Sequence, residues 1–128
     1  PVLCVGEQLS AREVGEHEDV VRAQLRSALA TSQSNLLIAY EPVWAIGTGL
    51  TATPDQVNDM HAVIKQEVES LLGGSQATPI LYGGSVNAEN ADALFACAHV
   101  DGALVGGASL EAASFTAIAQ SASNNLSH

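Results

Sequence analysis

Basic side chains are scarce in this 128-residue sequence, and none follows Lys65. Four lysines and arginines stand against 14 acids, which gives a formal net charge of -10. A chain with this balance is not expected to bind nucleic acid, whose phosphates need a positive surface. Any anion bound after Lys65 must be held by backbone N–H groups and helix N-termini.

Cysteines and long apolar runs are also few. Cys4 and Cys97 are the only two cysteines, and they lack the spacing of a disulfide framework or a metal site. That usage is typical of a reducing compartment, so we expect a cytoplasmic protein with no metal and no cofactor. No apolar run approaches the roughly 20 residues that a bilayer span needs, and the N-terminus lacks the basic start of a signal peptide. A membrane role is therefore not expected.

What the sequence does have is a regular alternation of short apolar runs and helical periodicity. The 47% apolar composition is enough for a single globular unit over residues 1–128. Four runs are predicted strands: residues 1–5, 36–40, 79–82 and 102–105. Four stretches have the apolar face of a helix: Val14, Val21, Leu25, Ala28 and Leu29; Val57, Met60, His61, Ile64, Val68, Leu71 and Leu72; Ala91, Leu94, Phe95 and Ala98; and Phe115, Ile118, Ala119 and Ala122. Strands separated by helices predict an α/β fold with a parallel sheet and right-handed crossovers.

The helix ends are marked most clearly around the second helix. Thr53 is a predicted N-cap, Pro54 fits the first helical position, and Gln56 completes a capping box. Gly73 and Gly74 predict its end. Asn87 is the predicted cap of the third helix.

Polar or glycine residues stand at the end of every predicted strand. Parallel strands are usually buried on both faces, so function is expected at their C-terminal ends. Those ends read Gly6-Glu7, Glu41-Pro42, Gly83-Gly84-Ser85 and Gly106-Gly107. The pattern resembles the mouth of a (β/α)8 barrel.

The two glycine clusters, "YGGSV" and "LVGGAS", permit close approach of the main chain to a ligand, and each precedes a predicted helix. Together they predict a phosphate cradle, with Ser85 adding a hydroxyl donor. The alternative is that the glycines only make tight turns after the strands. The sequence leaves both interpretations open.

Glu41 opens the segment "EPVWAIGTGLTATP", in which no other charge occurs. A carboxylate at a strand end is often only solvated or a local cap. Here stiff Pro42, apolar loop residues and two glycines predict a lid over residues 42–52. A closing apolar lid removes water from a carboxylate, which disfavours its ionised form and makes it a stronger base. Glu41 is therefore a candidate base for removing a proton next to a carbonyl group.

Several of these segments together resemble one family. "AYEPVWAIGTG", "TATP", "YGGSVNAEN" and "VDGALVGGASL" resemble the C-terminal half of triosephosphate isomerases, and the opening "PVLCVGE" resembles their fifth strand. The resemblance implies a (β/α)8 TIM barrel, of which this chain would supply strands five to eight, about half a barrel. It implies interconversion of dihydroxyacetone phosphate and glyceraldehyde 3-phosphate, with Glu41 as base and residues 42–52 as the closing loop. Gly47, Ser85, Gly106 and Gly107 would bind the substrate phosphate.

The resemblance also marks what departs from the family. The family usually has lysine at the position of Leu50, and its asparagine, lysine, histidine electrophile and further glutamate come from four earlier strands. Lys65 is interpreted as solvated. The four histidines are interpreted as surface or packing residues: His17, His61, His99 and His128. The chain alone is therefore expected to lack the electrophilic half of the site.

Three functions stay open at this point. The chain is a triosephosphate isomerase or part of one, another phosphate-binding barrel, or an inactive half barrel that only assembles. Because half a barrel leaves both edge strands bare, we expect a homo-oligomer or a complementing N-terminal half. Cys4 is expected to pack in the barrel wall. Glu7 either orients neighbouring side chains or is a plain loop carboxylate.

Overall fold

A four-stranded parallel sheet organises the chain. The computed structural model describes residues 1–31, 35–74 and 77–125. The strands, β1 (Val2–Val5), β2 (Leu37–Tyr40), β3 (Ile80–Tyr82) and β4 (Gly102–Ala103), lie in the order β1-β2-β3-β4. Each strand therefore pairs with the next along the chain, as in a barrel wall and unlike a doubly wound sheet.

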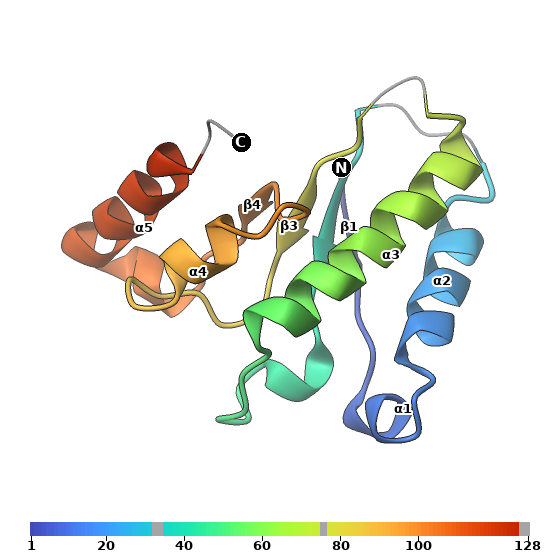
Figure 1. Ribbon diagram of the computed structural model, residues 1–128, viewed down its shortest axis with the longest axis horizontal. Coiled ribbons are helices and arrows are strands. Elements are labelled where there is room, and N and C mark those ends of the chain that lie inside the picture. Colours follow the sequence, from blue (N-terminus) through green and yellow to red (C-terminus); the bar gives the residue numbers. More distant parts are fainter. Residues whose placement is uncertain (32–34, 75–76, 126–128) are drawn as a thin grey trace.

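Helices follow the strands and cover one face of the sheet (Figure 1). In chain order the helical elements are α1 (Leu9–Glu13), α2 (His17–Ala28), the 3₁₀ turn η1 (Val43–Ala45), α3 (Pro54–Leu72), α4 (Ala91–Phe95), the 3₁₀ turn η2 (Gly107–Leu110) and α5 (Ala112–Asn124). α2 and α3 lie across β1 to β3, and α4 packs against α5 beyond β4 (Figure 1). Within the described ranges, no helix combines the length and apolarity that a membrane span requires.

The strand predictions are confirmed to within one residue for three strands. β1 pairs with β2 from Val2↔Leu37 to Val5↔Tyr40. The fourth strand was expected over residues 102–105 but is shorter, because β3 ends at Tyr82 and offers β4 only the pairs Leu81↔Gly102 and Tyr82↔Ala103.

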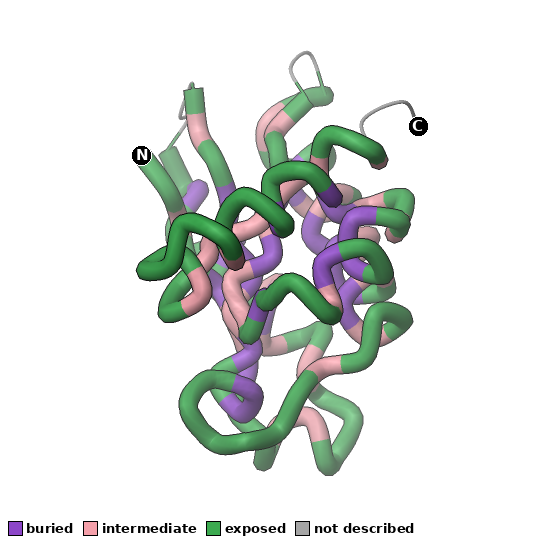
Figure 2. Tube along the Cα trace, turned by 90° about the vertical axis from the view of Figure 1, so that its left-hand side faces the viewer, coloured by how far each residue is buried: buried purple, intermediate pink, exposed green. Residues whose placement is uncertain are grey.

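The core lies between the sheet and the helices, where Figure 2 shows the buried residues gathered inside an exposed shell. Ile38 and Ile80 of the sheet are fully buried against Met60 and Ile64 of α3. Burying an aliphatic side chain of this size contributes about 1.5–3 kcal/mol, so the face of α3 is a main source of stability.

The other face of the sheet is not covered by helices, which corrects two expectations. Val2 is 46% exposed and Cys4 is also exposed, whereas Val5 is buried. β1 is thus buried on one face only, and Cys4 does not pack in a wall as predicted. On that face Val2 and Cys4 of β1 are exposed, whereas Ala39 of β2, which pairs with Cys4, is fully buried.

The predicted ends of α3 are confirmed. The Gln56 backbone N–H donates to Thr53 Oγ1 at 3.1 Å, and Thr53 N–H donates to Gln56 Oε1 at 2.9 Å. Gly73 ends the helix in the left-handed region at φ 84°. Asn87, by contrast, is not the cap of α4. Its side chain accepts from Glu89 and Asn90 N–H in the preceding turn, and α4 begins only at Ala91.

The predicted apolar face is buried as expected on α3, but some residues predicted on the other helical faces are exposed. Val14 is 67% exposed because Gly15, at φ 76°, separates it from α2. Phe115 is 46% exposed on α5, where Ile118 is the buried apolar residue. Ala28, Ala98 and Ala119 are exposed as well, whereas the α3 face is buried from Val57 to Val68.

Candidate active site

The C-terminal ends of the strands meet at one edge of the sheet, here called the mouth. Hydrogen bonds continue beyond the strands and hold the residue after β2 in place: Glu41 N–H donates to Val5 O at 2.7 Å, and Gly83 N–H donates to Tyr40 O at 2.8 Å. Glu41 is therefore fixed between the ends of β1 and β3, as parallel strand ends require.

Two glycines make room for Glu41. A β-carbon on Gly6 would lie 1.7 Å from the Glu41 carbonyl oxygen, and one on Gly83 would lie 2.6 Å from Glu41 Cγ and 3.1 Å from its Oε1. The main chain of Glu41 thus rests against Gly6, and its side chain lies over Gly83. Close approach, not backbone conformation, requires glycine at both positions.

The glycine pairs after β3 and β4 are not explained by left-handed turns. Within the described ranges, Gly83, Gly84, Gly106 and Gly107 are not among the residues with positive φ. A β-carbon on Gly84 would lie 2.1 Å from the Tyr82 hydroxyl, so this glycine also admits a neighbour. Gly106 and Gly107 have no atom within 4 Å of such a carbon, which leaves open space beside them.

The predicted phosphate-binding residues offer main-chain donors. Within the described part of the chain, the backbone N–H groups of Gly47, Ser85, Gly106 and Gly107 donate to no carbonyl or side chain. Ser85 is exposed, and its carbonyl accepts from Asn90 Nδ2 at 2.9 Å. The sequence predicted a helix directly after each glycine cluster. This is right only for the second cluster, where the 3₁₀ turn η2 begins at Gly107. After the first cluster, α4 begins only at Ala91, several residues beyond Ser85.

Residues 42–52, the predicted lid, form a braced loop with an exposed apolar surface. Thr48 Oγ1 donates to Trp44 O at 2.5 Å and accepts from Leu50 N–H at 3.2 Å. Gly47 and Gly49 adopt φ of 67° and 79°. Val43, Ile46 and Leu50 are 48%, 46% and 48% exposed, whereas Trp44 is buried. The loop therefore has its own internal hydrogen bonds and presents apolar side chains to solvent.

Glu7 belongs to a buried hydrogen-bonded network, which decides between the two interpretations of this residue. Its side chain is fully buried and accepts from the Tyr40 hydroxyl at 2.6 Å. Arg12 Nη2 lies 3.4 Å from Glu7 Oε2 and also 3.4 Å from the Tyr40 hydroxyl. Burial and the hydrogen bond to Glu7 raise the pKa of Tyr40, so its phenol stays protonated and donates. Glu7 thus orients the residue just before Glu41. Sequence reasoning did not find Tyr40 and Arg12 as its partners, because both contacts depend on tertiary packing.

Cys4 lies near Glu41 on the uncovered face of the sheet. Burial and the charge of Glu41 raise the pKa of the Cys4 thiol, so it remains protonated near neutral pH. In the residues that the structure describes, no group of three or more histidine, cysteine or acidic side chains is arranged to hold a metal ion.

Comparison with known proteins identifies the family of the chain. A family model described as triosephosphate isomerase matches residues 1–122. The chain belongs to the triosephosphate isomerase family. It is 53% identical over 124 residues to the triosephosphate isomerase of Neisseria meningitidis serogroup A, covering 97% of this chain and 49% of the relative. The Treponema pallidum enzyme is 52% identical over 126 residues, covering 94% and 51%. The Xanthomonas campestris enzyme is 53% identical over 127 residues, covering 95% and 51%.

The chain thus spans about half the length of the triosephosphate isomerases that it matches. Its four parallel strands in consecutive order, with helices on one face, are a partial α/β barrel of this family.

His61 lies on the helix side of the sheet, away from the mouth. His61 is fully buried on α3 beneath Tyr40 and Tyr82, and its Nδ1 lies 3.1 Å from His99 O. Burial lowers the pKa of His61 to about 4, so it is neutral at physiological pH. This confirms the prediction of a packing role for His61. His128 lies outside the described residues.

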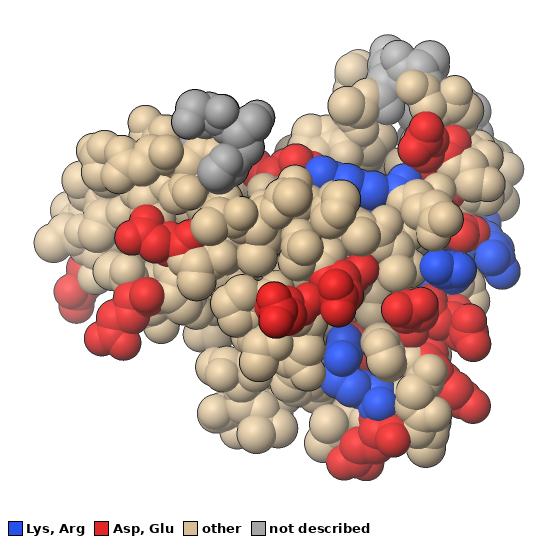
Figure 3. Space-filling view, in the orientation of Figure 1, with Lys and Arg blue, Asp and Glu red and all other residues tan. Residues whose placement is uncertain are grey.

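The basic residues gather on one side of the molecule on the face shown in Figure 3. On the face shown in Figure 3, the basic side chains lie toward α2 and α3, and the α4–α5 side carries only acids. Lys65, predicted to be solvated, instead forms an ion pair with Asp101 at 3.1 Å and is about one-third exposed. Asp101 also accepts from Ile80 N–H at 2.9 Å, so the pair ties α3 to the starts of β3 and β4.

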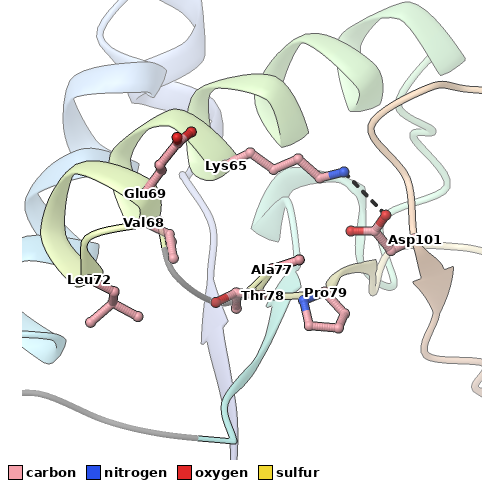
Figure 4. Close-up of a pocket in the computed structure, with 9 residues that line it drawn as sticks. Lys65, Val68, Glu69, Leu72, Ala77, Thr78, Pro79 and Asp101 are labelled. Atoms are coloured by element: carbon pink, nitrogen blue, oxygen red, sulfur yellow. Dashed lines mark hydrogen bonds and ion pairs between the residues drawn. The ribbon is translucent and has the colours of Figure 1, made fainter.

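A cavity of about 530 Å³ lies beside this ion pair. Figure 4 shows Lys65 and Asp101 at its edge, with Thr78 and Pro79 just before β3. It is therefore at the end of the sheet opposite Glu41. In a barrel of this kind that end contributes to stability and the other end to catalysis.

Proposed function

We propose that the chain is the base-carrying, C-terminal half of a triosephosphate isomerase, corresponding to strands five to eight of the barrel. The match to the family over nearly the whole chain, at about half the relatives' length, supports this assignment. So does the presence of four consecutive parallel strands in one sheet.

In this proposal Glu41 is the catalytic base. Its carboxylate removes a proton from the carbon next to the carbonyl group of dihydroxyacetone phosphate, and the C–H electron pair forms an enediolate. Return of a proton to the adjacent carbon, together with transfer of the hydroxyl proton from one enediolate oxygen to the other, gives glyceraldehyde 3-phosphate. The observation that carries the proposal is the placement of the Glu41 side chain over Gly83, directly before the lid in the chain. A base must lie within hydrogen-bond reach of the carbon acid, and Glu41 is only partly buried.

The substrate phosphate would be bound by neutral donors. The N–H groups of Gly47, Ser85, Gly106 and Gly107 are available, and no lysine or arginine follows Lys65. Backbone amides are well suited to this task, because they are fixed by the fold and need no reorganisation when an anion binds.

Residues 42–52 would then close over the substrate. The apolar side chains of Val43, Ile46 and Leu50 are about half exposed, and closure would bring such surface over the mouth. Excluding water strengthens the interaction of a base with its substrate and protects the enediolate from side reactions. Leu50, where the family usually has lysine, is expected to alter the rate of opening and closing but not the chemistry.

The electrophilic half of the site must come from elsewhere. His61 lies on the helix side of the sheet against the His99 carbonyl, and Lys65 pairs with Asp101 at the end opposite the mouth, so none of these three side chains is at the mouth. β1 and β4 each have one neighbouring strand, and a second four-stranded unit would complete an eight-stranded ring. A second copy or a separate N-terminal half would supply it, and the latter brings the missing polar residues. Both cysteines are free thiols, which fits the cytoplasmic location expected from the sequence.

The test is a coupled isomerase assay on the purified chain, alone and mixed with the N-terminal half of a relative. We expect turnover only in the mixture. Glu41→Gln should abolish turnover in the mixture but leave phosphate binding nearly intact. The matched control is Glu89→Gln, at an exposed acid beyond Ser85, and it should retain turnover. Phosphate binding without turnover, in a mixture that assembles, would support the inactive half barrel instead.

A further inference from the structure

We propose that Arg12 is a positioning residue for the lid, holding its first turn through contact with the ring of Trp44. The guanidinium carbon of Arg12 lies 5.3 Å from the centre of the indole ring. Arg12 comes from α1, after β1, whereas Trp44 lies in η1 within the lid. The contact therefore connects the segment after β1 to the predicted lid.

The Arg12 guanidinium also contacts two buried side chains, Glu7 and Tyr40. Its Nη2 atom lies 3.4 Å from the fully buried Glu7 carboxylate and 3.4 Å from the Tyr40 hydroxyl. The Arg12 side chain is only 16% exposed. Because Glu7 and Tyr40 restrict where the guanidinium can lie, its position over the ring is set by the fold and does not depend on Trp44.

For Trp44, Arg12 provides the charged contact. The indole Nε1 is buried and has no hydrogen-bond partner in the described part of the chain, and Trp44 as a whole is 9% exposed. An indole ring that leaves this position would lose the cation–π contact and gain exposure to water. Arg12 therefore biases the lid toward the arrangement in which Trp44 is docked against α1.

The size of this bias follows from the contact. A cation–π contact at a partly exposed site contributes about 1 kcal/mol, which changes the equilibrium constant between docked and undocked Trp44 about five-fold. Removing the guanidinium should thus raise the population of chains with an undocked Trp44 about five-fold. Arg12 would act on catalysis only through the lid, since it touches neither Glu41 nor the proposed phosphate-binding residues in the contacts described.

Trp44 is the only tryptophan in the chain, so its fluorescence reports the lid directly. The experiment compares acrylamide quenching and the emission maximum in Arg12→Met, Glu7→Gln and the double variant Glu7→Gln/Arg12→Met. The control is Arg26→Met, whose side chain pairs with Glu67 at 2.7 Å and is 62% exposed. Circular dichroism checks that each variant is folded.

We expect stronger quenching and a red shift in Arg12→Met and in the double variant. We expect a signal like the parent chain in Arg26→Met and in Glu7→Gln, whose amide oxygen can still accept from Tyr40 and Arg12. The double variant is included because Arg12→Met leaves the buried Glu7 charge unpaired and so destabilises the fold. Parent-like quenching in a folded double variant would overturn the proposal. An equal change in Glu7→Gln would also overturn it, because the effect would then come from Glu7. Failure of the double variant to fold would overturn it as well, because Arg12 would then be needed for folding and not for holding the lid.

This inference rests on the proposed function, because a lid matters only where it closes over a substrate. The fluorescence readout, however, needs no turnover. If quenching responds as expected and the mixture with an N-terminal half shows no isomerase activity, the proposed function fails while the role of Arg12 in holding residues 42–52 stands.

Discussion

Adding one methyl group at Gly83 should disable the proposed base without unfolding the chain. A β-carbon there would lie 2.6 Å from Glu41 Cγ, so the Glu41 side chain must move about 0.8 Å to reach the 3.4 Å of an ordinary contact. Misplacing a reacting group by about 1 Å typically costs about 100-fold in rate. We therefore expect Gly83→Ala to lower kcat about 100-fold in the complemented assembly, with little change in KM, since the phosphate-binding residues are not displaced.

Stability should change little in Gly83→Ala, because the atom in the way belongs to a side chain that is only partly buried. We expect a change of less than about 1 kcal/mol in the free energy of unfolding, measured by urea denaturation. Gly6→Ala is the matched comparison. There the added carbon would lie 1.7 Å from the Glu41 carbonyl oxygen, which is main chain held by neighbouring strands. Overpacking against fixed backbone should cost about 3 kcal/mol or more.

The contrast between the two variants is what tests the reasoning. Near-parental turnover in Gly83→Ala would show that the position of Glu41 over Gly83 is not the reactive one. Equal loss of stability in both variants would show that Glu41 is held by packing at Gly83 as rigidly as its main chain is at Gly6, and the side-chain argument would fail.

Three further predictions concern stability, measured by urea unfolding. His61 is buried and its pKa is lowered from 6.5 to about 4, so the unfolded chain takes up the proton first and stability should fall by about 1.4 kcal/mol per pH unit as pH drops from 6.5 toward 4. His61→Gln should flatten that slope, and an unchanged slope would contradict the assignment. Asp101→Ala should cost about 1–3 kcal/mol, because it removes the acceptor for a main-chain N–H at the start of β3. Lys65→Met should cost under about 1 kcal/mol, because the ion pair is partly exposed. Equal losses of stability in Asp101→Ala and Lys65→Met would show that the ion pair, and not the hydrogen bond to the main chain, is the stabilising contact. Thr53→Ala should cost about 1 kcal/mol through loss of the α3 cap, whereas Thr51→Ala, at an exposed position before the helix, should be neutral.

Local signals predicted the elements that local interactions determine. The ends of α3 were readable because the Thr53 cap and Gly73 act within a few residues of each other. The strands were readable from their apolar runs, and the position of Glu41 at a strand end followed from the alternation of strands and helices. These features need no knowledge of distant contacts.

What depended on tertiary contacts was missed. Glu7, Arg12 and Tyr40 come together only because β1 and β2 pair in the register Val5↔Tyr40. The exposure of Phe115 and Cys4 was not foreseen either, because an apolar residue or a strand position gives no sign of whether anything covers it.

We propose that Glu41 carries a proton between two carbons of a bound triose phosphate. The most direct test of this proposal is conversion of dihydroxyacetone phosphate in D₂O by the chain mixed with an N-terminal half. A proton held on a carboxylate exchanges with solvent, so we expect deuterium on the carbon next to the carbonyl group in part of the product, and no conversion with Glu41→Gln. Product entirely free of deuterium, or undiminished conversion by Glu41→Gln, would contradict the claim.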